Sequence, residues 1–364
     1  MIPKVKRLDI SKSRVLCVSD IHGCYDLLER LLIKNNYNKE EDYLFILGDI
    51  SRKGPHPLKT LRYVMELAKN EKVVVTMGNC DEADYLDFLP QSIEWFRKFM
   101  YSHNLINDFL KEKYNTTIFP DFTDDEILIL QEEFINKEEI KFIRNLYHVI
   151  ETGDYLFTHA RVPLEFDLEK NDYHEFIQGR GFYNDGHNIN KTVVVGHMPT
   201  TIFVKNFYDN SILFDTKRKF IMIDGGNVVH RGGQINLLEI KDNVPRFIDH
   251  IDNLEERFVL KTQTSPTPAK GTCWPYYKIE ILERKKHFSL CKLPETLEIC
   301  LIKNEMISND EQTTIDDCPG MLLDVKQNDI VKIVEEFSGY SLIKKNSKLG
   351  WIKNEYLGGQ NEIK

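Results

Sequence analysis

The sequence predicts a layered α/β domain followed by a small all-β domain. The first prediction rests on short apolar strands that alternate with amphipathic helices through the first 250 residues. The second rests on short β-type segments, without a long helix, after residue 275. The expected boundaries are an α/β domain over residues 1–250, a linker over 251–275 and a β domain over 276–360.

The α/β domain opens with strands that are separated by helices. Short apolar runs predict strands over residues 14–19, 43–47 and 73–77. Helical spacing is clear over residues 58–68 and, before them, in Leu27, Leu28, Leu31 and Leu32. This order of strand, loop, helix and strand is typical of a layered α/β fold.

Residues 84–146 interrupt the strands with aromatic and charged residues at helical spacing. We expect a helical insertion there, with helices over 93–111, 123–136 and 138–146. Thr123 to Glu126 fits a capping box at the start of the second of these helices. Strands are expected to resume at 155–158, 193–195, 220–223 and 235–240.

The end of the chain has a different pattern. Residues 262–275 are polar and contain three prolines, which is typical of a linker. After them, strands are expected over 276–282, 287–293, 329–334, 340–343 and 350–352. These short segments predict a small barrel.

The composition excludes several classes of function. The 364 residues include 57 acidic and 48 basic ones, a net charge of −9, which argues against a nucleic-acid coat or a membrane-surface protein. No apolar run is long enough for a transmembrane helix, and no secretory signal is expected at the N-terminus. The seven cysteines include no CxxC pair, so we expect no disulfide framework and a reducing cytoplasmic location.

Five short motifs with metal-type ligands each follow a predicted strand. They are Asp20-x-His22, Gly48-Asp49, Gly78-Asn79, His159 and Gly196-His197. Because the carboxyl ends of strands converge on one crevice, we expect these groups to meet in space. Carboxylate, imidazole and amide oxygen suit Mn²⁺, Fe²⁺ or Zn²⁺.

The spacing of these ligands favours two metal ions. Asp20 and His22 lie around one turn and are expected to hold the first ion, and Asn79, His159 and His197 are expected to hold the second. Asp49 is the expected bridge between the two ions. Each motif is a weak signal alone, but five such motifs at strand ends are very improbable by chance.

The order DIHG, GDIxxKGP, GNCD, THA and GHMPT over residues 14–240 resembles the calcineurin-like metallophosphoesterases. The branch it most resembles is that of the serine/threonine phosphatases, which includes bacterial phosphoprotein phosphatases and diadenosine tetraphosphate hydrolases; Pro199 in the last motif supports this branch. The resemblance implies a four-layer α/β/β/α sandwich and two divalent cations, with Mn²⁺ the first choice and Fe or Zn the alternatives. It also implies that a hydroxide between the ions attacks phosphorus in line.

Two positions depart from the family pattern and leave the leaving-group acid open. Cys80 stands where the branch usually has a histidine, and Arg52 stands where it has the partner aspartate. The Gly-Asn-Cys-Asp form resembles bacterial phosphodiesterases of the same superfamily. Water, Asp81 or the substrate are the remaining candidates for the acid, since a thiol beside metals is a poor one. We therefore expect slow hydrolysis of unactivated alkyl monoesters and faster hydrolysis of phosphoanhydrides, aryl esters or diesters.

Cationic side chains should contact the substrate phosphate. Lys53 takes the place of a family arginine, with Arg52 beside it. For the second family arginine, Arg180 is the best match and Arg161 the alternative.

The resemblance favours a serine/threonine phosphoprotein phosphatase. A nucleotide phosphohydrolase or phosphodiesterase is the first alternative, and a phosphate-sensing scaffold without turnover is the second. Residues 277–358 resemble the bacterial SH3-like domain, for which a peptide or a second copy of the chain is the expected partner.

Overall fold

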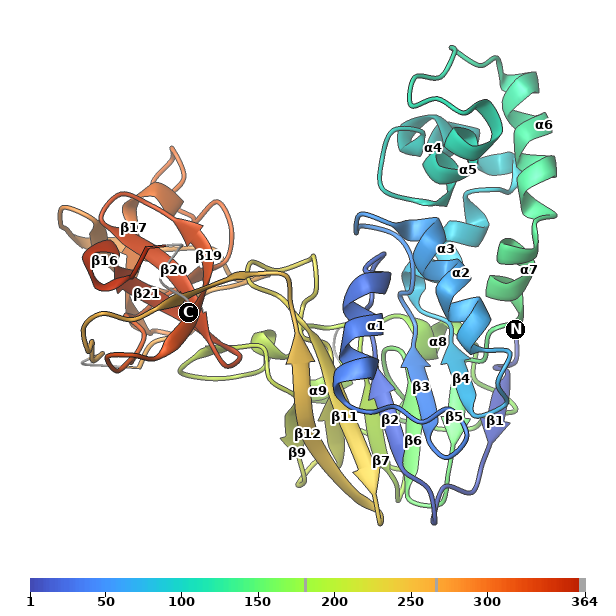
Figure 1. The fold of residues 1–364 in the computed structure, drawn as a ribbon, viewed down its shortest axis with the longest axis horizontal. Coiled ribbons are helices and arrows are strands. Elements are labelled where there is room, and N and C mark those ends of the chain that lie inside the picture. The colour runs from blue at the N-terminus through green and yellow to red at the C-terminus, as the bar shows by residue number, and fades with distance from the viewer. Residues whose placement is uncertain (180–181, 266–267, 360–364) are drawn as a thin grey trace. The chain divides into compact units, whose positions relative to one another are not determined.

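The computed structural model describes residues 1–179, 182–265 and 268–359. The described chain forms two compact units (Figure 1). Unit 1 comprises residues 1–198, 212–229 and 234–251, and unit 2 comprises 199–211, 230–233 and the residues from 252 onward. In the described ranges, no helix is long and apolar enough to cross a membrane.

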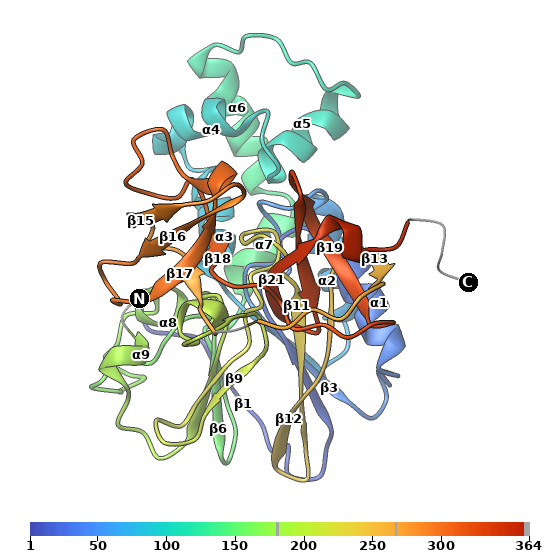
Figure 2. The same ribbon diagram turned by 90° about the vertical axis from the view of Figure 1, so that its left-hand side faces the viewer.

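Unit 1 is built on two sheets that face each other (Figure 2). The first has the order β1 (Val5–Arg7), β5 (Val149–Glu151), β6 (Tyr155–Thr158), β7 (Thr192–Val195), β10 (Phe220–Met222) and β9 (Leu213–Asp215). The second has the order β12 (Val244–Ile251), β11 (Ile235–Lys241), β2 (Val15–Val18), β3 (Tyr43–Leu47) and β4 (Val73–Thr76). In the second sheet β2, β3 and β4 are parallel, so their carboxyl ends lie at one edge.

Alternating side chains of the strands form separate cores on the two faces of the second sheet. Cys17 and Phe45 face the first sheet, where the Phe45 and Phe157 rings meet edge to face with centroids 4.9 Å apart. Leu16 and Leu44 face the other way and pack with helices α1 (Tyr25–Lys34) and α2 (Pro57–Leu67). The four α1 leucines that the helical spacing indicated are all buried in this outer core.

Two short helices, α8 (His174–Ile177) and α9 (Phe182–Asp185), contribute the outer layer of the first sheet. Ile221 of β10 faces the core between the sheets, whereas the adjacent Phe220 contacts the rings of Tyr183 and His187. The predicted α/β/β/α sandwich is therefore confirmed, with a fourth layer thinner than the helices on the opposite side.

The helical insertion contains α3 (Asn79–Leu86), α4 (Ile93–Phe99), α5 (Leu105–Tyr114), α6 (Asp124–Ile135) and α7 (Glu138–Asn145). Its helices α4 to α6 extend beyond the carboxyl ends of β3 and β4 (Figure 1). A single helix was expected over 93–111, but the structure has two helices there, α4 and α5. Asn104 caps α5 by accepting a hydrogen bond from Asn107 N–H at 3.0 Å. The capping box at Thr123 and Glu126 is present at the start of α6.

Unit 2 consists of antiparallel strand pairs. One sheet has the order β13 (Glu255–Phe258), β19 (Ile330–Glu336), β20 (Tyr340–Lys345), β21 (Lys348–Lys353) and β8 (Tyr208–Asp209). The smaller sheets pair β15 (Glu280–Arg284), β16 (Phe288–Lys292) and β17 (Ile299–Lys303), and β14 (Gly271–Thr272) with β18 (Cys318–Pro319). Trp351 is completely buried in this unit and donates through its indole N–H to Pro319 O at 2.7 Å.

Unit 2 contains strands that lie outside the β domain expected over residues 276–360. β13 and β14 lie within residues 251–275, the expected linker. In addition, β8 comes from the segment that directly follows Met198 and pairs with β21.

Candidate functional site

The five predicted motifs lie at the carboxyl ends of neighbouring strands in both sheets. In the second sheet Asp20, Asp49 and Asn79 follow the adjacent strands β2, β3 and β4. In the first sheet His159 and His197 follow the adjacent strands β6 and β7. Parallel strand ends bring these distant residues together, as the sequence indicated.

Left-handed backbone conformations turn several of these side chains into the site. The φ angles of Asp20, His22, Asp49 and His197 are 53°, 48°, 55° and 67°. Such values are uncommon for residues with a Cβ and cost free energy, so the surrounding structure has to hold them. Backbone hydrogen bonds do so, from Asp20 N–H to Gly48 O at 3.1 Å and from His22 N–H to Asp49 O at 2.9 Å.

Asp20, His22 and Asp49 lie together as candidate ligands of one ion, and we call them the first ligand group. His22 Nε2 lies 3.8 Å from Asp20 Oδ1 and 3.7 Å from Asp49 Oδ2. Ligand atoms that each sit about 2 Å from one ion are separated by distances of this order. Asp20 also accepts a hydrogen bond from His197 N–H through Oδ2 at 3.0 Å, a contact that joins the two sheets.

The second ligand group forms on the other oxygen of Asp49. His159 Nε2 lies 3.4 Å from Asp49 Oδ1 and 3.2 Å from Asn79 Oδ1. His159 Nδ1–H donates to Leu47 O at 2.7 Å, which leaves Nε2 free to act as a ligand. The rings of His159 and His197 have centroids 5.1 Å apart.

The charges of the site fit divalent cations. Burial, and then the Asp49 carboxylate, raises the pKa of Asp20 to about 8, so the two carboxylates resist ionising together. A divalent cation between them would supply the missing positive charge. Burial lowers the pKa of His22 to about 4, which keeps the ring in its neutral, metal-binding form. These groups therefore fit a dinuclear metal site.

Glycines permit the close approach of the loops. Gly48 has a φ of 72°, and a Cβ there would lie 2.5 Å from Gly78 N. A Cβ on Gly78 would lie 2.2 Å from Asp49 Oδ1 and 2.4 Å from Asp49 N. A side chain at Gly78 would therefore displace Asp49, and a side chain at Gly48 would displace the backbone of Gly78.

The two cations after Asp49 have different surroundings. Lys53 Nζ lies 3.5 Å from His22 Nε2, beside the first ligand group. Arg52 is instead bound to two carboxylates at the end of α3: Nε lies 3.0 Å from Oδ1 of Asp84, and a second nitrogen contacts Asp87, the residue that follows the helix. The Arg52 guanidinium also lies 4.9 Å from the centre of the Phe99 ring. Sequence reasoning missed Asp84 and Asp87, and no motif marks them.

Cys80 and Asp81 lie in the first turn of α3. Asp81 is completely buried and accepts three backbone hydrogen bonds of 2.8–2.9 Å, from Asp49, Ile50 and Gly78. Burial, and then the Asp49 charge, raises the pKa of Asp81 to about 7. Burial likewise raises the pKa of the Cys80 thiol well above its ordinary value. Cys80 lies close to His22 and Asp49, with potential ligand atoms mutually within 4.8 Å.

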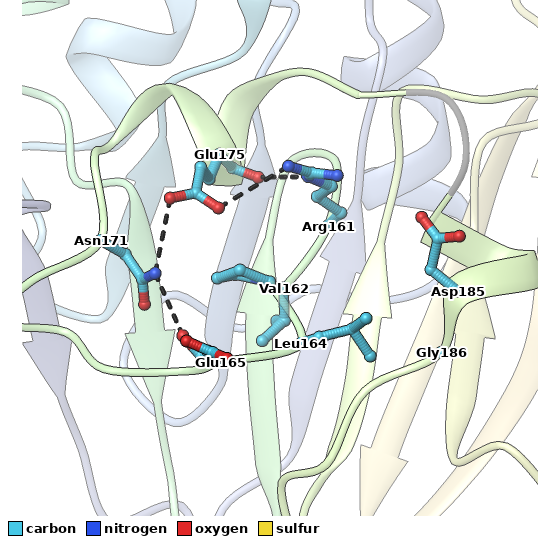
Figure 3. Close-up of a pocket in the computed structure, with 9 residues that line it drawn as sticks. Arg161, Val162, Leu164, Glu165, Asn171, Glu175, Asp185 and Gly186 are labelled. Atoms are coloured by element: carbon cyan, nitrogen blue, oxygen red, sulfur yellow. Dashed lines mark hydrogen bonds and ion pairs between the residues drawn. The ribbon is translucent and has the colours of Figure 1, made fainter.

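A cavity of about 500 Å³ is lined by Asn79 and His197 from the second ligand group, together with Arg161, His174, Glu175, Gln178 and Gly179. Arg161 Nε donates to Glu175 O at 3.3 Å, and the same two residues line a neighbouring pocket of about 400 Å³ (Figure 3). Arg161, the alternative to Arg180 in the sequence analysis, thus lines this cavity. Arg180 lies outside the described residues.

His174 is a cavity residue that sequence reasoning passed over. Its Nε2 lies 2.9 Å from Glu82 Oε1, and its Nδ1 lies 2.5 Å from Asp172 Oδ1. Glu82 is 92 positions earlier in the chain, so no local pattern could have connected the two residues.

The chain is similar over a short stretch to several curated proteins. The symmetrical bis(5'-nucleosyl)-tetraphosphatase of Hamiltonella defensa subsp. Acyrthosiphon pisum is 45% identical over 64 residues, which are 18% of this chain and 22% of that protein. The chain thus spans about a fifth of the length of the curated relatives it matches.

Solved structures are similar over a larger part of the chain. A putative diadenosine tetraphosphatase is 18% identical with a TM-score of 0.44, covering 68% of this chain and 97% of that one. A cold-active protein-tyrosine phosphatase of a psychrophilic Shewanella is 15% identical with a TM-score of 0.44, covering 68% and 83%. Residues 13–233, more than half of the chain, match the calcineurin-like phosphoesterases, and the chain therefore belongs to that family.

Proposed function

We propose that this protein is a phosphoesterase that uses two divalent cations. The proposed ligands are Asp20, His22 and Asp49 for the first ion, and Asp49, Asn79, His159 and His197 for the second. The observation that carries the proposal is Asp49, whose two oxygens face separate ligand groups at 3.7 and 3.4 Å. Cations held there would supply Lewis acidity and lower the pKa of a water molecule. Mn²⁺ is our first choice, with Fe or Zn as alternatives, because the donor set suits each of them.

We assign phosphate binding to Lys53 and Arg161. Lys53 lies beside the first ligand group, and Arg161 lines the cavity at the second. Arg52 is bound to Asp84 and Asp87, and its proposed role is to position the loop that carries Asp49 and Lys53. A phosphate-binding role for Arg180 stays a prediction.

Two substrate classes are candidates. The motif Gly48-Asp49 followed by Lys53-Gly54-Pro55 resembles that of the phosphoprotein phosphatases and supports a phosphoserine or phosphothreonine substrate. The curated relatives carry the name symmetrical bis(5'-nucleosyl)-tetraphosphatase, which supports dinucleoside polyphosphates. Hydrolysis of a phosphopeptide and of diadenosine tetraphosphate, compared under the same conditions, separates them.

The test of the phosphoesterase proposal is Mn²⁺-dependent hydrolysis of p-nitrophenyl phosphate and bis-p-nitrophenyl phosphate. We expect Asp49→Asn to lower turnover by at least about 10³-fold, because it removes the shared ligand. Asp310→Asn, at an exposed carboxylate in unit 2, is the matched control and should behave as the wild type. Diester turnover alone would favour a phosphodiesterase. Cation binding without turnover of either ester would instead favour a phosphate-sensing scaffold.

We also propose that unit 2 is SH3-like and binds a peptide or a second copy of the chain. Its antiparallel sheet around the buried Trp351 supports this assignment. All seven cysteines, each within the described ranges, are free, which agrees with the proposed reducing cytoplasmic location.

A further inference from the structure

The side chains at and beside the usual position of the leaving-group acid are either held by other groups or buried. Asp81 accepts three backbone hydrogen bonds, and Arg52 is held by Asp84 and Asp87. The Cys80 side chain is only 5% exposed and is not among the described residues that line the cavity. A proton for the leaving oxygen therefore has to come from a different part of the site.

The cavity contains one imidazole, His174, besides the proposed ligand His197, counting only residues that the structure describes. The His174 side chain is 45% exposed, so a substrate can reach it. Asp172, two residues earlier, holds Nδ1 at 2.5 Å. An imidazole whose Nδ1 is fixed by a carboxylate presents its Nε2 proton in a defined direction, which is the arrangement of an acid–base histidine.

Glu82 holds the other ring nitrogen and comes from α3, the helix that begins with Asn79. Glu82 also accepts a hydrogen bond from the Tyr173 hydroxyl. The Glu82 carboxylate therefore still has a hydrogen-bond donor when His174 Nε2 leaves it to contact the substrate. Proton donors often form their reactive hydrogen bond only after the substrate has entered. The contact between Nε2 and Glu82 in the free protein is therefore compatible with transfer to a substrate oxygen.

Resting on the proposed phosphoesterase function, we propose that His174 is the catalytic acid that protonates the leaving oxygen, with Asp172 and Glu82 as positioning residues. As the bond from water oxygen to phosphorus forms, the bond to the leaving oxygen breaks, and the Nε2 proton passes to that oxygen. The attacking water releases a proton to solvent, and neutral His174 takes one from solvent before the next turnover. The net reaction is ester plus water to phosphate plus alcohol.

The test compares a good and a poor leaving group, p-nitrophenyl phosphate and phenyl phosphate. Nitrophenolate departs without a proton near neutral pH, whereas phenolate needs one. We expect His174→Gln to lower kcat for phenyl phosphate by about 10²–10³-fold and to change kcat for p-nitrophenyl phosphate by less than about 5-fold. Equal losses on both substrates would show a structural role, and an unchanged rate on phenyl phosphate would remove His174 from the reaction.

Two further variants sharpen the result. Asp172→Asn should give an intermediate loss on phenyl phosphate, since it weakens the hold on Nδ1, and His187→Gln, at an imidazole on the outer face of the first sheet, should give none. If the wild type hydrolyses neither ester, the phosphoesterase proposal fails rather than this one.

The pH profile gives a second readout. We expect the alkaline limb of kcat for phenyl phosphate to disappear in His174→Gln, and a limb that persists unchanged would contradict the assignment. The charged and titratable groups around the ring are Asp172 with the N-terminal ammonium, Glu82, the Tyr173 hydroxyl, His148, and Arg161 with Glu175. If His174 supplies the proton, unactivated alkyl monoesters should be hydrolysed faster than the sequence alone predicts.

Discussion

Asp49 connects the two ligand groups, and its position depends on backbone hydrogen bonds and on the space left by a glycine. Its Oδ1 accepts a hydrogen bond from Cys80 N–H at 2.9 Å, and its own N–H donates to Asp81 at 2.8 Å. Gly78 leaves the space in which these contacts form. A charged side chain in a strained backbone conformation needs such support on several sides.

We expect Gly78→Ala to lower phosphoesterase turnover by about 10²-fold or more, because the new Cβ would lie 2.2 Å from Asp49 Oδ1. Mn²⁺ affinity, measured by titration calorimetry, should fall as well. Gly153→Ala is the matched control, since its Cβ would meet nothing within 4 Å. Wild-type turnover and Mn²⁺ affinity in Gly78→Ala would contradict this account of the site.

Paired strands determine where the site residues lie, and the pairing at the edge of the first sheet depends on a neutral histidine. His148 precedes β5 and Lys4 precedes β1, its parallel neighbour. Lys4 N–H donates to His148 Nδ1 at 2.8 Å, which requires an unprotonated nitrogen. Burial lowers the pKa of His148 from 6.5 to about 4.

This lowered pKa predicts a stability change in mild acid. Between about pH 6.5 and pH 4 the unfolded chain binds a proton at His148 that the folded chain does not bind, so the free energy of unfolding decreases as pH falls through this range. The expected decrease is about 2–3 kcal/mol.

Urea unfolding of wild type and His148→Gln at pH 7 and pH 5 measures this contribution. The other titrating groups change the free energy of unfolding of both proteins equally, so their effect cancels when the two pH dependences are subtracted. Far-ultraviolet circular dichroism follows unit 1, which contains the described α-helices. Glutamine can accept from Lys4 N–H and does not titrate, so the variant should lose less stability than the wild type on acidification. Parallel pH dependences would show that His148 titrates normally in the folded state.

The chain as a whole does not divide into consecutive domains. Unit 2 includes residues 199–211 and 230–233, which lie inside the stretch that matches the phosphoesterase family. Tyr208 is 1% exposed in the core of unit 2, and its hydroxyl donates to Asp317 at 2.6 Å. The second unit thus depends on a segment that begins directly after the His197 loop.

We expect Tyr208→Ala to lower the free energy of unfolding of unit 2 by about 3–5 kcal/mol, through loss of a buried ring and its hydrogen bond. Tryptophan fluorescence in a Trp95→Phe background reports this transition, since Trp274 and Trp351 belong to unit 2 and Trp95 belongs to unit 1. Phe214→Ala, at a side chain that is 38% exposed in β9, is the control and should leave that transition in place. An unchanged transition in Tyr208→Ala would mean that the C-terminal residues fold without this segment.

The local sequence was sufficient for the central strands of unit 1, for α1 and α2, and for the convergence of the five motifs at the strand ends. Apolar periodicity marked β2, β3 and β4, and the side chains at their carboxyl ends had to converge because parallel strands end at one edge. The same reasoning applied to His159 and His197. Motifs of this kind can be found without coordinates because backbone pairing alone brings them together.

Contacts between loops and helices far apart in the chain required the folded structure. Arg52 binds Asp84 and Asp87 instead of facing solvent, His174 meets Glu82, and Tyr208 belongs to the C-terminal sheet. No periodicity or spacing encodes these contacts. They depend on which side chains meet when the insertion packs against the sandwich and when a returning strand completes a sheet.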